Sequence, residues 1–237
     1  MYRGKAELVE IIQETHDTKT YRLKLENETK MDFKPGQFIV LVIPLEHGGG
    51  PQFSRAYSIA SSPTESLIDL TMNVVGAFTT KMNGFEPGVV LKMQGPFGKF
   101  AFDETQQKEI VTIAGGTGIT PFRSMWRYIK AKNLPTKMTV LISYKTAGDE
   151  IYKDELAEIE KQGVKTYVTV TREAEGSAWK GHRGRITGET IKQQCGSLEG
   201  KTFFICGSNS MNDSMLQLLL SLGVPKEQII TEKWGEY

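Results

Sequence analysis

Thiols and imidazoles are scarce in this sequence. Its 237 residues include two cysteines, Cys195 and Cys206, and three histidines. Two thiols exclude a four-thiolate iron–sulfur cluster built by this chain alone and provide no framework of disulfides. The histidines are scattered at positions 16, 47 and 182, which argues against a metal site. No metal centre is therefore expected.

Long apolar segments and an excess of one charge are also absent. The longest apolar run, Phe38–Pro44, is far too short to span a bilayer. Charged residues interrupt Met1–Glu10, where a signal peptide would have a continuous apolar stretch. Lys and Arg number 29 against 28 Asp and Glu, so no basic nucleic-acid footprint stands out. We expect a cytoplasmic protein that neither binds nucleic acid nor inserts directly into a membrane.

The first hundred residues have the pattern of closely spaced strands. Apolar residues alternate over Tyr21–Leu25 and Ile68–Val74 and are nearly continuous over Phe38–Ile43. Turns rich in Gly and Pro lie between these segments. This pattern predicts an antiparallel β-barrel.

After Asp103, short apolar runs alternate with helix-like stretches, which predicts βαβ units and a parallel sheet. One helix is expected over Asp149–Gln162, with Tyr152, Leu156 and Ile159 on one face, and another over Asn209–Leu222, capped by Gly223. The boundary is expected within Phe102–Lys108, which gives a first domain over 1–103 and a second over 104–237. The expected strands are 110–114, 138–143, 164–170 and 202–206.

The segment Ile110–Pro121 combines a buried strand, a glycine-rich turn and the start of a helix. Glycines let backbone N–H groups approach a pyrophosphate, and a helix N-terminus favours its negative charge. Pro121 stands where a standard dinucleotide fingerprint has its third glycine, but proline suits the first turn of a helix. An ordinary strand-to-helix turn is the alternative interpretation.

A second candidate site lies in the strand-like stretch Arg55–Ser58, where alternation places Arg55, Tyr57 and Ile59 on one face. A forked cation, a flat aromatic ring and a hydroxyl group suit a phosphate-bearing aromatic ligand. The alternative is an edge strand with a solvated arginine and a packed tyrosine.

Five motifs in one order and spacing make the chain similar to a known family. Over nearly its whole length it resembles the ferredoxin–NADP reductase family, in which one domain holds FAD and the next brings a nicotinamide dinucleotide to it. The motifs are Arg55-Ala56-Tyr57-Ser58, Gly76-Ala77-Phe78-Thr79, Gly95-Pro96-Phe97-Gly98, Gly115–Pro121 and Cys206-Gly207.

In the first domain, the resemblance implies an FAD site. Arg55 would pair with the FAD pyrophosphate, Tyr57 would stack on the isoalloxazine ring, and Ser58 would hydrogen-bond flavin N5. The Thr79 hydroxyl and nearby backbone N–H groups would meet the FAD phosphates. The further residues assigned to FAD are Ala56, Met72, Asn73, Val74, Gly76, Phe78 and Thr80.

In the second domain, the resemblance implies that the glycine-rich turn cradles the nicotinamide dinucleotide, through Gly116, Thr117, Gly118, Thr120 and Pro121. Cys206 and Gly207 would border the site of hydride transfer, and Glu232 would approach the flavin. From composition alone, Cys206 would be a buried structural cysteine and Glu232 a solvated charge. Trp234 is expected to cover the flavin, with Tyr237 as the alternative.

The choice of nicotinamide depends on arginines. Arg172 matches the position of an arginine in bacterial NADP-using members of the family, and Arg183 and Arg185 follow it. A 2′-phosphate needs such a cationic pocket, so NADP(H) is favoured over NAD(H). If Arg172 is only an exposed charge, the enzyme would use NADH.

The resemblance therefore implies an FAD-dependent oxidoreductase in which a hydride passes between nicotinamide C4 and flavin N5. Ser58, Cys206 and Glu232 would flank the reacting centre. The expected partner is a separate electron-transfer protein, a ferredoxin or flavodoxin. The alternatives are service as the reductase component of an oxygenase or other redox complex, and a nucleotide-binding accessory subunit without nicotinamide chemistry.

Overall fold

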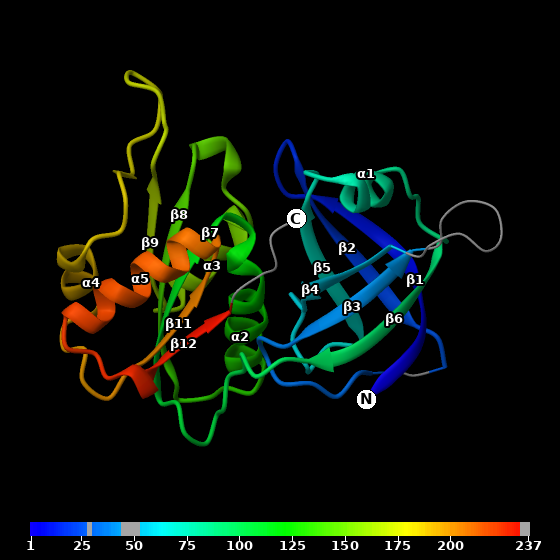
Figure 1. The fold of residues 1–237 in the computed structure, drawn as a ribbon, viewed down its shortest axis with the longest axis horizontal. Helices are drawn as coiled ribbons and strands as arrows, with labels where there is room; N and C mark the ends of the chain where they lie inside the picture. Colours follow the sequence, from blue (N-terminus) through cyan, green and yellow to red (C-terminus); the bar gives the residue numbers. More distant parts are fainter. Residues whose placement is uncertain (28–29, 44–52, 233–237) are drawn as a thin grey trace. The chain divides into compact units, whose positions relative to one another are not determined.

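The computed structural model describes residues 1–27, 30–43 and 53–232 (Figure 1). Contacts divide the chain into two compact units. Of the described residues, the first unit contains 1–102 and 120–132, and the second contains 103–119 and 133–232. Each unit has its own hydrophobic core.

The first unit contains a six-stranded antiparallel sheet in the order β4-β3-β6-β1-β2-β5. The two outer strands of this order meet, because Ile59, just beyond β4, bridges Leu70 in β5 and the Ala60 N–H donates to the Asp69 carbonyl at 2.8 Å. The sheet thus curls into an antiparallel barrel, which confirms the predicted fold class. Its strands are β1 (Tyr2–Gln13), β2 (Thr18–Leu25), β3 (Phe38–Ile43), β4 (Phe53–Ser58), β5 (Leu67–Asn73) and β6 (Val90–Phe97).

Strand alternation fills the interior of the barrel. In β2, Tyr21, Leu23 and Leu25 are buried, while Lys24 between them is exposed. Each large apolar side chain removed from water in this way stabilises the fold by about 1.5–3 kcal/mol. After β5, the short helix α1 (Ala77–Asn83) follows Gly76, which is its N-cap residue.

The second unit contains a six-stranded sheet in the order β10-β9-β8-β7-β11-β12, and every neighbouring pair is parallel. All four apolar runs predicted as strands belong to it, so the parallel-sheet prediction is confirmed. Its strands are β7 (Glu109–Gly115), β8 (Lys137–Tyr144), β9 (Lys165–Val170), β10 (His182–Arg183), β11 (Thr202–Cys206) and β12 (Ile229–Glu232).

Helices α4 (Gly188–Cys195) and α5 (Asn209–Ser221) cover one face of this sheet, in front of it in Figure 1. Their apolar residues join the core formed by alternate strand residues such as Val111 and Phe203. Helix α5 ends as predicted: Gly223 has a φ of +84°, and its N–H donates to the Leu220 carbonyl. None of the helices in the described ranges is long and apolar enough to cross a membrane.

The helix predicted over Asp149–Gln162 is shorter than expected. It is α3 (Lys153–Lys161), preceded by the 3₁₀ turn η2 (Ala147–Asp149). Tyr152 adopts the left-handed conformation, with φ of 57°, so a helix cannot run through it. Tyr152, Leu156 and Ile159 are nevertheless all buried.

Helix α2 (Thr120–Ala131) follows β7 and the 3₁₀ turn η1 (Gly116–Ile119), and Pro121 lies in its first turn as predicted. Its apolar face is buried against residues of the first unit. Phe122 packs against Phe100 with ring centroids 5.9 Å apart, and Tyr128 packs against Phe102 at 6.4 Å. The chain therefore passes between the units at each end of this helix.

Candidate active site

The ends of three parallel strands meet in the second unit. The order of the sheet reverses beside β7, because β8 lies on one side of it and β11 on the other. Ala114 in β7 pairs with Cys206 in β11, and Cys206 pairs with Glu232 in β12. Ligands of parallel α/β sheets bind outside the carboxyl ends of strands at such a reversal. The register thus brings Cys206 and Glu232 together at the place where such a ligand binds.

Glycines allow the turn after β7 to lie against the end of β11. A Cβ atom on Gly118 would collide with the Cys206 carbonyl group, and one on Gly207 would lie 3.3 Å from the Gly115 nitrogen. Gly116 has a φ of +54° and open space beside it. This cradle of bare backbone fits a dinucleotide pyrophosphate, which binds through N–H groups that side chains would otherwise cover. Thr117 lies within the turn, and Thr120 and Pro121 begin α2.

Cys206 and Glu232 have different surroundings. Cys206 is fully buried, while Glu232 is partly exposed. Asn212 in α5 is 1% exposed, and its Nδ2 donates to the Glu232 backbone carbonyl at 2.5 Å. Asn212 was not among the site residues predicted from the sequence, although an amide on a helix face among apolar residues was a usable signal. Its amide ties the end of β12 to α5.

The predicted flavin residues lie along β4 and β5 in the first unit. Arg55 is exposed and donates to the Ser54 carbonyl at 2.9 Å, whereas Ser58 is 3% exposed. The Tyr57 ring is half-buried and packs against the Phe78 ring at 5.6 Å. Ile59 is fully buried in the barrel core, and Tyr57 is partly buried against the same core. Ala56 lies between Arg55 and Tyr57 in β4, and Met72, Asn73 and Val74 lie at the end of β5.

The turn before α1 uses the Thr79 hydroxyl internally. Thr79 Oγ1 accepts from the Val75 and Gly76 N–H groups at 3.0 and 3.1 Å and donates to the Gly76 carbonyl at 3.1 Å. The hydroxyl therefore shapes this turn. Gly76 and Thr80 are exposed beside it, and open space surrounds Gly76.

Arg172 and Arg183 lie at the two ends of the loop between β9 and β10, and they differ in their contacts. The Arg183 guanidinium donates to the Glu173 carbonyl at 3.1 Å, to the Ala174 carbonyl at 3.3 Å and to Ser177 Oγ at 2.9 Å. Arg172 is exposed, and its backbone N–H donates to the Lys145 carbonyl at 2.7 Å. Arg183 thus closes the loop on itself.

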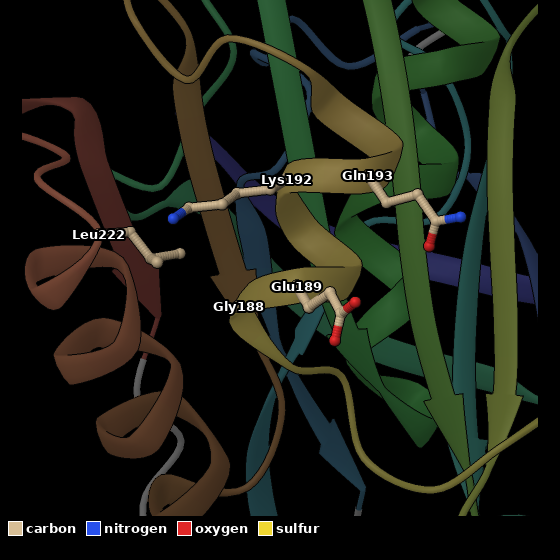
Figure 2. A pocket seen from close by; sticks show the side chains of 5 residues that line it. All are labelled: Gly188, Glu189, Lys192, Gln193 and Leu222. Atoms are coloured by element: carbon tan, nitrogen blue, oxygen red, sulfur yellow. The ribbon is translucent and has the colours of Figure 1, made fainter.

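Trp234 and Tyr237, the two candidates for covering the flavin, lie outside the described residues. A pocket of about 660 Å³ lies elsewhere, between α4 and α5 (Figure 2). None of the residues predicted for the cofactors lines it. Its lining residues are Gly188, Glu189, Lys192, Gln193 and Leu222.

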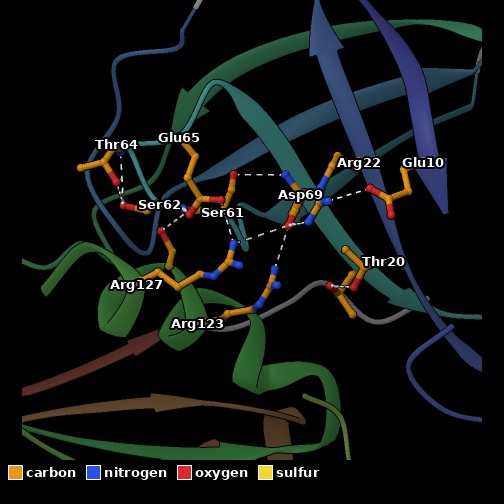
Figure 3. Close-up of polar contacts among 12 residues, drawn as sticks. Glu10, Thr20, Arg22, Ser61, Ser62, Thr64, Glu65, Asp69, Arg123 and Arg127 are labelled. Atoms are coloured by element: carbon orange, nitrogen blue, oxygen red, sulfur yellow. Dashed lines mark hydrogen bonds and ion pairs between the residues drawn. The ribbon is translucent and has the colours of Figure 1, made fainter. Parts of the chain in front are cut away.

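A cluster of charges in the first unit, formed by buried Asp69 and Arg123 with half-buried Arg22, was not predicted from the sequence (Figure 3). The signal was a carboxylate within a buried strand, between Ile68 and Leu70, and an arginine within the apolar face of a helix. Charged residues at such positions are rarely buried unless they are paired.

Two family models match the chain in succession. The model described as "Oxidoreductase FAD-binding domain" matches residues 5–102, and the one described as "Oxidoreductase NAD-binding domain" matches residues 112–217. Together they cover both units.

Individual relatives agree with these matches. The chain is 32% identical over 211 residues to ferredoxin–NADP reductase B of Sorangium cellulosum, a match covering 85% of each chain. It is 27% identical to the glycine betaine monooxygenase reductase subunit of Pseudomonas aeruginosa; that match covers 96% of this chain but 63% of that protein.

Among solved structures, the cytochrome b5 reductase domain of Ulva prolifera nitrate reductase matches with a TM-score of 0.86 and 24% identity, over 98% of this chain and 97% of that one. This likeness supports the two-domain fold. Fold, ordered motifs and the Sorangium relative lead to one conclusion. The chain belongs to the ferredoxin–NADP reductase family of oxidoreductases, with an FAD-binding domain followed by a nicotinamide-nucleotide-binding domain.

Proposed function

We propose that this enzyme takes a hydride from NADPH and passes the electrons through FAD to a separate carrier, a ferredoxin or a flavodoxin. The observation that carries the proposal is the register of β7, β11 and β12. It gathers a bare glycine cradle, Cys206 and Glu232 at the carboxyl ends of adjacent parallel strands. The likeness to the Sorangium reductase supports a carrier of the ferredoxin type.

Bound FAD supplies the redox chemistry, since it can accept a hydride and release electrons one or two at a time. The chain supplies binding and orientation. Arg55 offers an exposed guanidinium to the FAD pyrophosphate, Tyr57 a ring to the isoalloxazine and Ser58 a hydroxyl to flavin N5. Gly116 to Pro121 hold the nicotinamide dinucleotide, while Cys206 and Glu232 border the reacting centre.

The contacts of the two arginines give them separate roles in nucleotide choice. We assign the 2′-phosphate contact to Arg172, whose exposed side chain lies at the start of the loop. We assign Arg183 a structural role in ordering the loop, because its guanidinium donates hydrogen bonds to the loop's own carbonyl groups. The Ala147 N–H donates a hydrogen bond to Glu173 Oε2 at 2.6 Å. This hydrogen bond further fixes the loop and lowers the pKa of Glu173.

Single substitutions separate these roles. A charge-assisted hydrogen bond contributes about 1.5–3 kcal/mol, so Arg172→Gln should raise KM for NADPH about 10- to 150-fold and leave KM for NADH unchanged. Arg183→Gln should raise KM for NADPH and for NADH alike. Lys161→Gln, at an exposed cation of α3 outside this loop, serves as the control. Equal effects of Arg172→Gln on both nucleotides would remove Arg172 from the phosphate site.

The overall function is tested by the absorption spectrum of the purified protein, followed by anaerobic addition of NADPH and, separately, NADH. We expect a flavin spectrum that is bleached, faster by NADPH. Reoxidation by added ferredoxin or flavodoxin then tests the carrier. A colourless protein that is not bleached by either nucleotide after reconstitution with FAD would indicate a nucleotide-binding accessory subunit instead.

A second candidate is a reductase component of an oxygenase, favoured by the 27% identity to the monooxygenase reductase subunit. The two candidates share one nicotinamide and flavin site and differ only in the acceptor. Fast reoxidation by an oxygenase component, together with slow reoxidation by free ferredoxin and flavodoxin, would favour this second candidate.

A further inference from the structure

Helix α2 follows the nucleotide-binding turn in sequence but packs with the barrel. It starts at Thr120, directly after the glycine-rich turn, so its first turn contains Thr120 and Pro121, two residues proposed to bind the dinucleotide. Its contacts nevertheless place it with the barrel unit. The residues that hold the first turns of α2 in place are therefore barrel residues.

Three polar contacts join α2 to the barrel, and Figure 3 labels Arg123 and Arg127, which make two of them. Arg123 Nη1 donates to Asp69 Oδ2 in β5 at 2.9 Å, and Ser124 Oγ donates to the Ser61 carbonyl at 2.7 Å. One turn later, Arg127 Nη1 donates to Glu65 Oε2 at 2.7 Å. Positions 123, 124 and 127 lie close together on a helix surface, so the three contacts act on one side of α2.

The contact nearest the start of the helix is also the most deeply buried. Asp69 is 1% exposed and Arg123 is 5% exposed. Asp69 also accepts two hydrogen bonds from Arg22 in β2, from Nε at 2.9 Å and from Nη2 at 3.2 Å. Burial, the largest single influence, raises the pKa of Asp69, but the hydrogen bonds and charges of Arg22 and Arg123 together hold that pKa below its ordinary value. The carboxylate is thus charged and shared between a barrel strand and α2.

Burying such an ion pair is a weak way to gain stability, because desolvation offsets most of the attraction, and an apolar pair of similar volume would stabilise as well. What a buried carboxylate–guanidinium pair adds is direction, since its hydrogen bonds are made in only one arrangement. The apolar side of α2 already packs through Phe122 and Met125, both fully buried. Apolar packing therefore attaches α2 to the barrel without Arg123, and the ion pair determines the position of the helix.

We propose that Arg123 and Asp69 are positioning residues for hydride transfer. They hold the first turn of α2, with Thr120 and Pro121, in the place where that turn receives the dinucleotide. Neither residue touches a cofactor in this role; both act through α2. The inference rests on the proposed function, because that function supplies the nucleotide that the first turn of α2 would position.

The chain offers a matched control for the test. Arg123→Gln and Arg22→Gln each remove one guanidinium from Asp69, but only Arg123 lies on α2. We expect Arg123→Gln to slow flavin reduction at saturating NADPH about 10- to 100-fold, the effect of a misplacement on the order of 1 Å. Bound FAD should be unchanged. Arg22→Gln should lower Tm yet keep the reduction rate within about twofold of the wild type. Arg123→Lys, which keeps a cation, should recover part of the rate.

Ser124→Ala is the milder variant for the case in which Arg123→Gln does not fold. It removes only the contact with Ser61 and should slow reduction without loss of FAD. Equal slowing by Arg22→Gln and Arg123→Gln, or slowing that follows Tm across all variants, would overturn the proposal. It would leave the cluster a structural role only.

Amide hydrogen exchange gives a readout that needs no activity. Arg123→Gln should lower protection over Thr120–Ala131, and Arg22→Gln should not. If neither NADPH nor NADH reduced the wild-type protein, the proposed function would be refuted. The exchange comparison would still test whether the Arg123–Asp69 ion pair holds α2 in place. Unchanged protection of α2 in Arg123→Gln would refute the positioning role whatever the activity.

Discussion

Gly118→Ala tests the geometry of the glycine cradle most directly. The structure gives Gly118 no left-handed φ, so an alanine backbone is unstrained there and only space decides the outcome. The added Cβ would collide with the Cys206 carbonyl oxygen and lie 2.6 Å from its carbon and 3.0 Å from the Gly207 nitrogen. Ordinary contact begins near 3.4 Å, so the turn or the end of β11 must move by more than roughly 0.8 Å.

The cost of this movement follows from known overpacking effects. Both neighbours are backbone atoms, which cannot rotate away, so we expect a penalty of about 1–3 kcal/mol. If the penalty falls on nucleotide binding, it weakens binding about 5- to 150-fold. Reduced conformational freedom of the unfolded chain returns about 0.4–1 kcal/mol to stability, but it does not restore affinity.

The assay is a titration of the flavin difference spectrum with NADP⁺, together with a thermal melt. Gly84→Ala, where the nearest atom to the added Cβ lies at an ordinary 3.6 Å, is the control and should match the wild type. Gly118→Ala with wild-type affinity and wild-type Tm would refute the idea that close backbone approach at Cys206 shapes the nucleotide site.

Three further predictions concern ionisable groups. Burial raises the pKa of Tyr21 to about 12, above about 10 in the unfolded chain, so stability should fall between pH 10 and 12 as the unfolded state deprotonates first. Tyr21→Phe should abolish that fall and, since the hydroxyl has no partner among the described residues, raise the unfolding free energy at pH 7 by about 1 kcal/mol, measured by urea titration. Asp69, with its lowered pKa, should contribute stability above about pH 4 that is lost as the pH falls toward that pKa. Asp69→Asn should cost about 3–5 kcal/mol at pH 7 and show a shallower acid transition, and an acid transition as steep as in the wild type would contradict this account. Burial, partly offset by Lys201 and Lys165, raises the pKa of the Cys195 thiol to about 11, so the folded protein should react slowly with a thiol reagent at pH 8 and the unfolded protein rapidly; rapid reaction of the folded protein would be inconsistent with this burial.

Most of the fold could be predicted from the sequence because its cores follow simple periods. The alternation in β2 and the continuous apolar runs of β7, β8 and β11 reflect one-sided and two-sided burial. The start of α3 could not be predicted this way. Tyr152 has the spacing of a helical residue, but its φ of 57°, which keeps the helix from starting before Lys153, depends on its tertiary surroundings.

The individual residues of the candidate site could be predicted from the sequence, but their proximity in the fold could not. Ala114, Cys206 and Glu232 are far apart in sequence, and only the strand order β7-β11-β12 makes them neighbours. The β-branched run Ile229-Ile230-Thr231 was a usable signal for the strand that carries Glu232. Nothing in the sequence distinguishes Arg183 from Arg172, because the carbonyl groups that engage Arg183 belong to the backbone of a folded loop.

The charged clamp of α2 shows why a periodic pattern understates what holds a helix. Phe122, Met125 and Trp126 mark the buried face of α2, and the pattern alone predicts packing against the sheet of its own βαβ unit. Arg123 lies within that buried face, where a charge is costly unless a partner compensates it. The partner is Asp69, in a strand of the barrel, and the two are 54 residues apart in sequence. An arginine inside an apolar helix face and a carboxylate inside a buried strand each need the other, so such residues in a two-domain sequence can be tested as a pair.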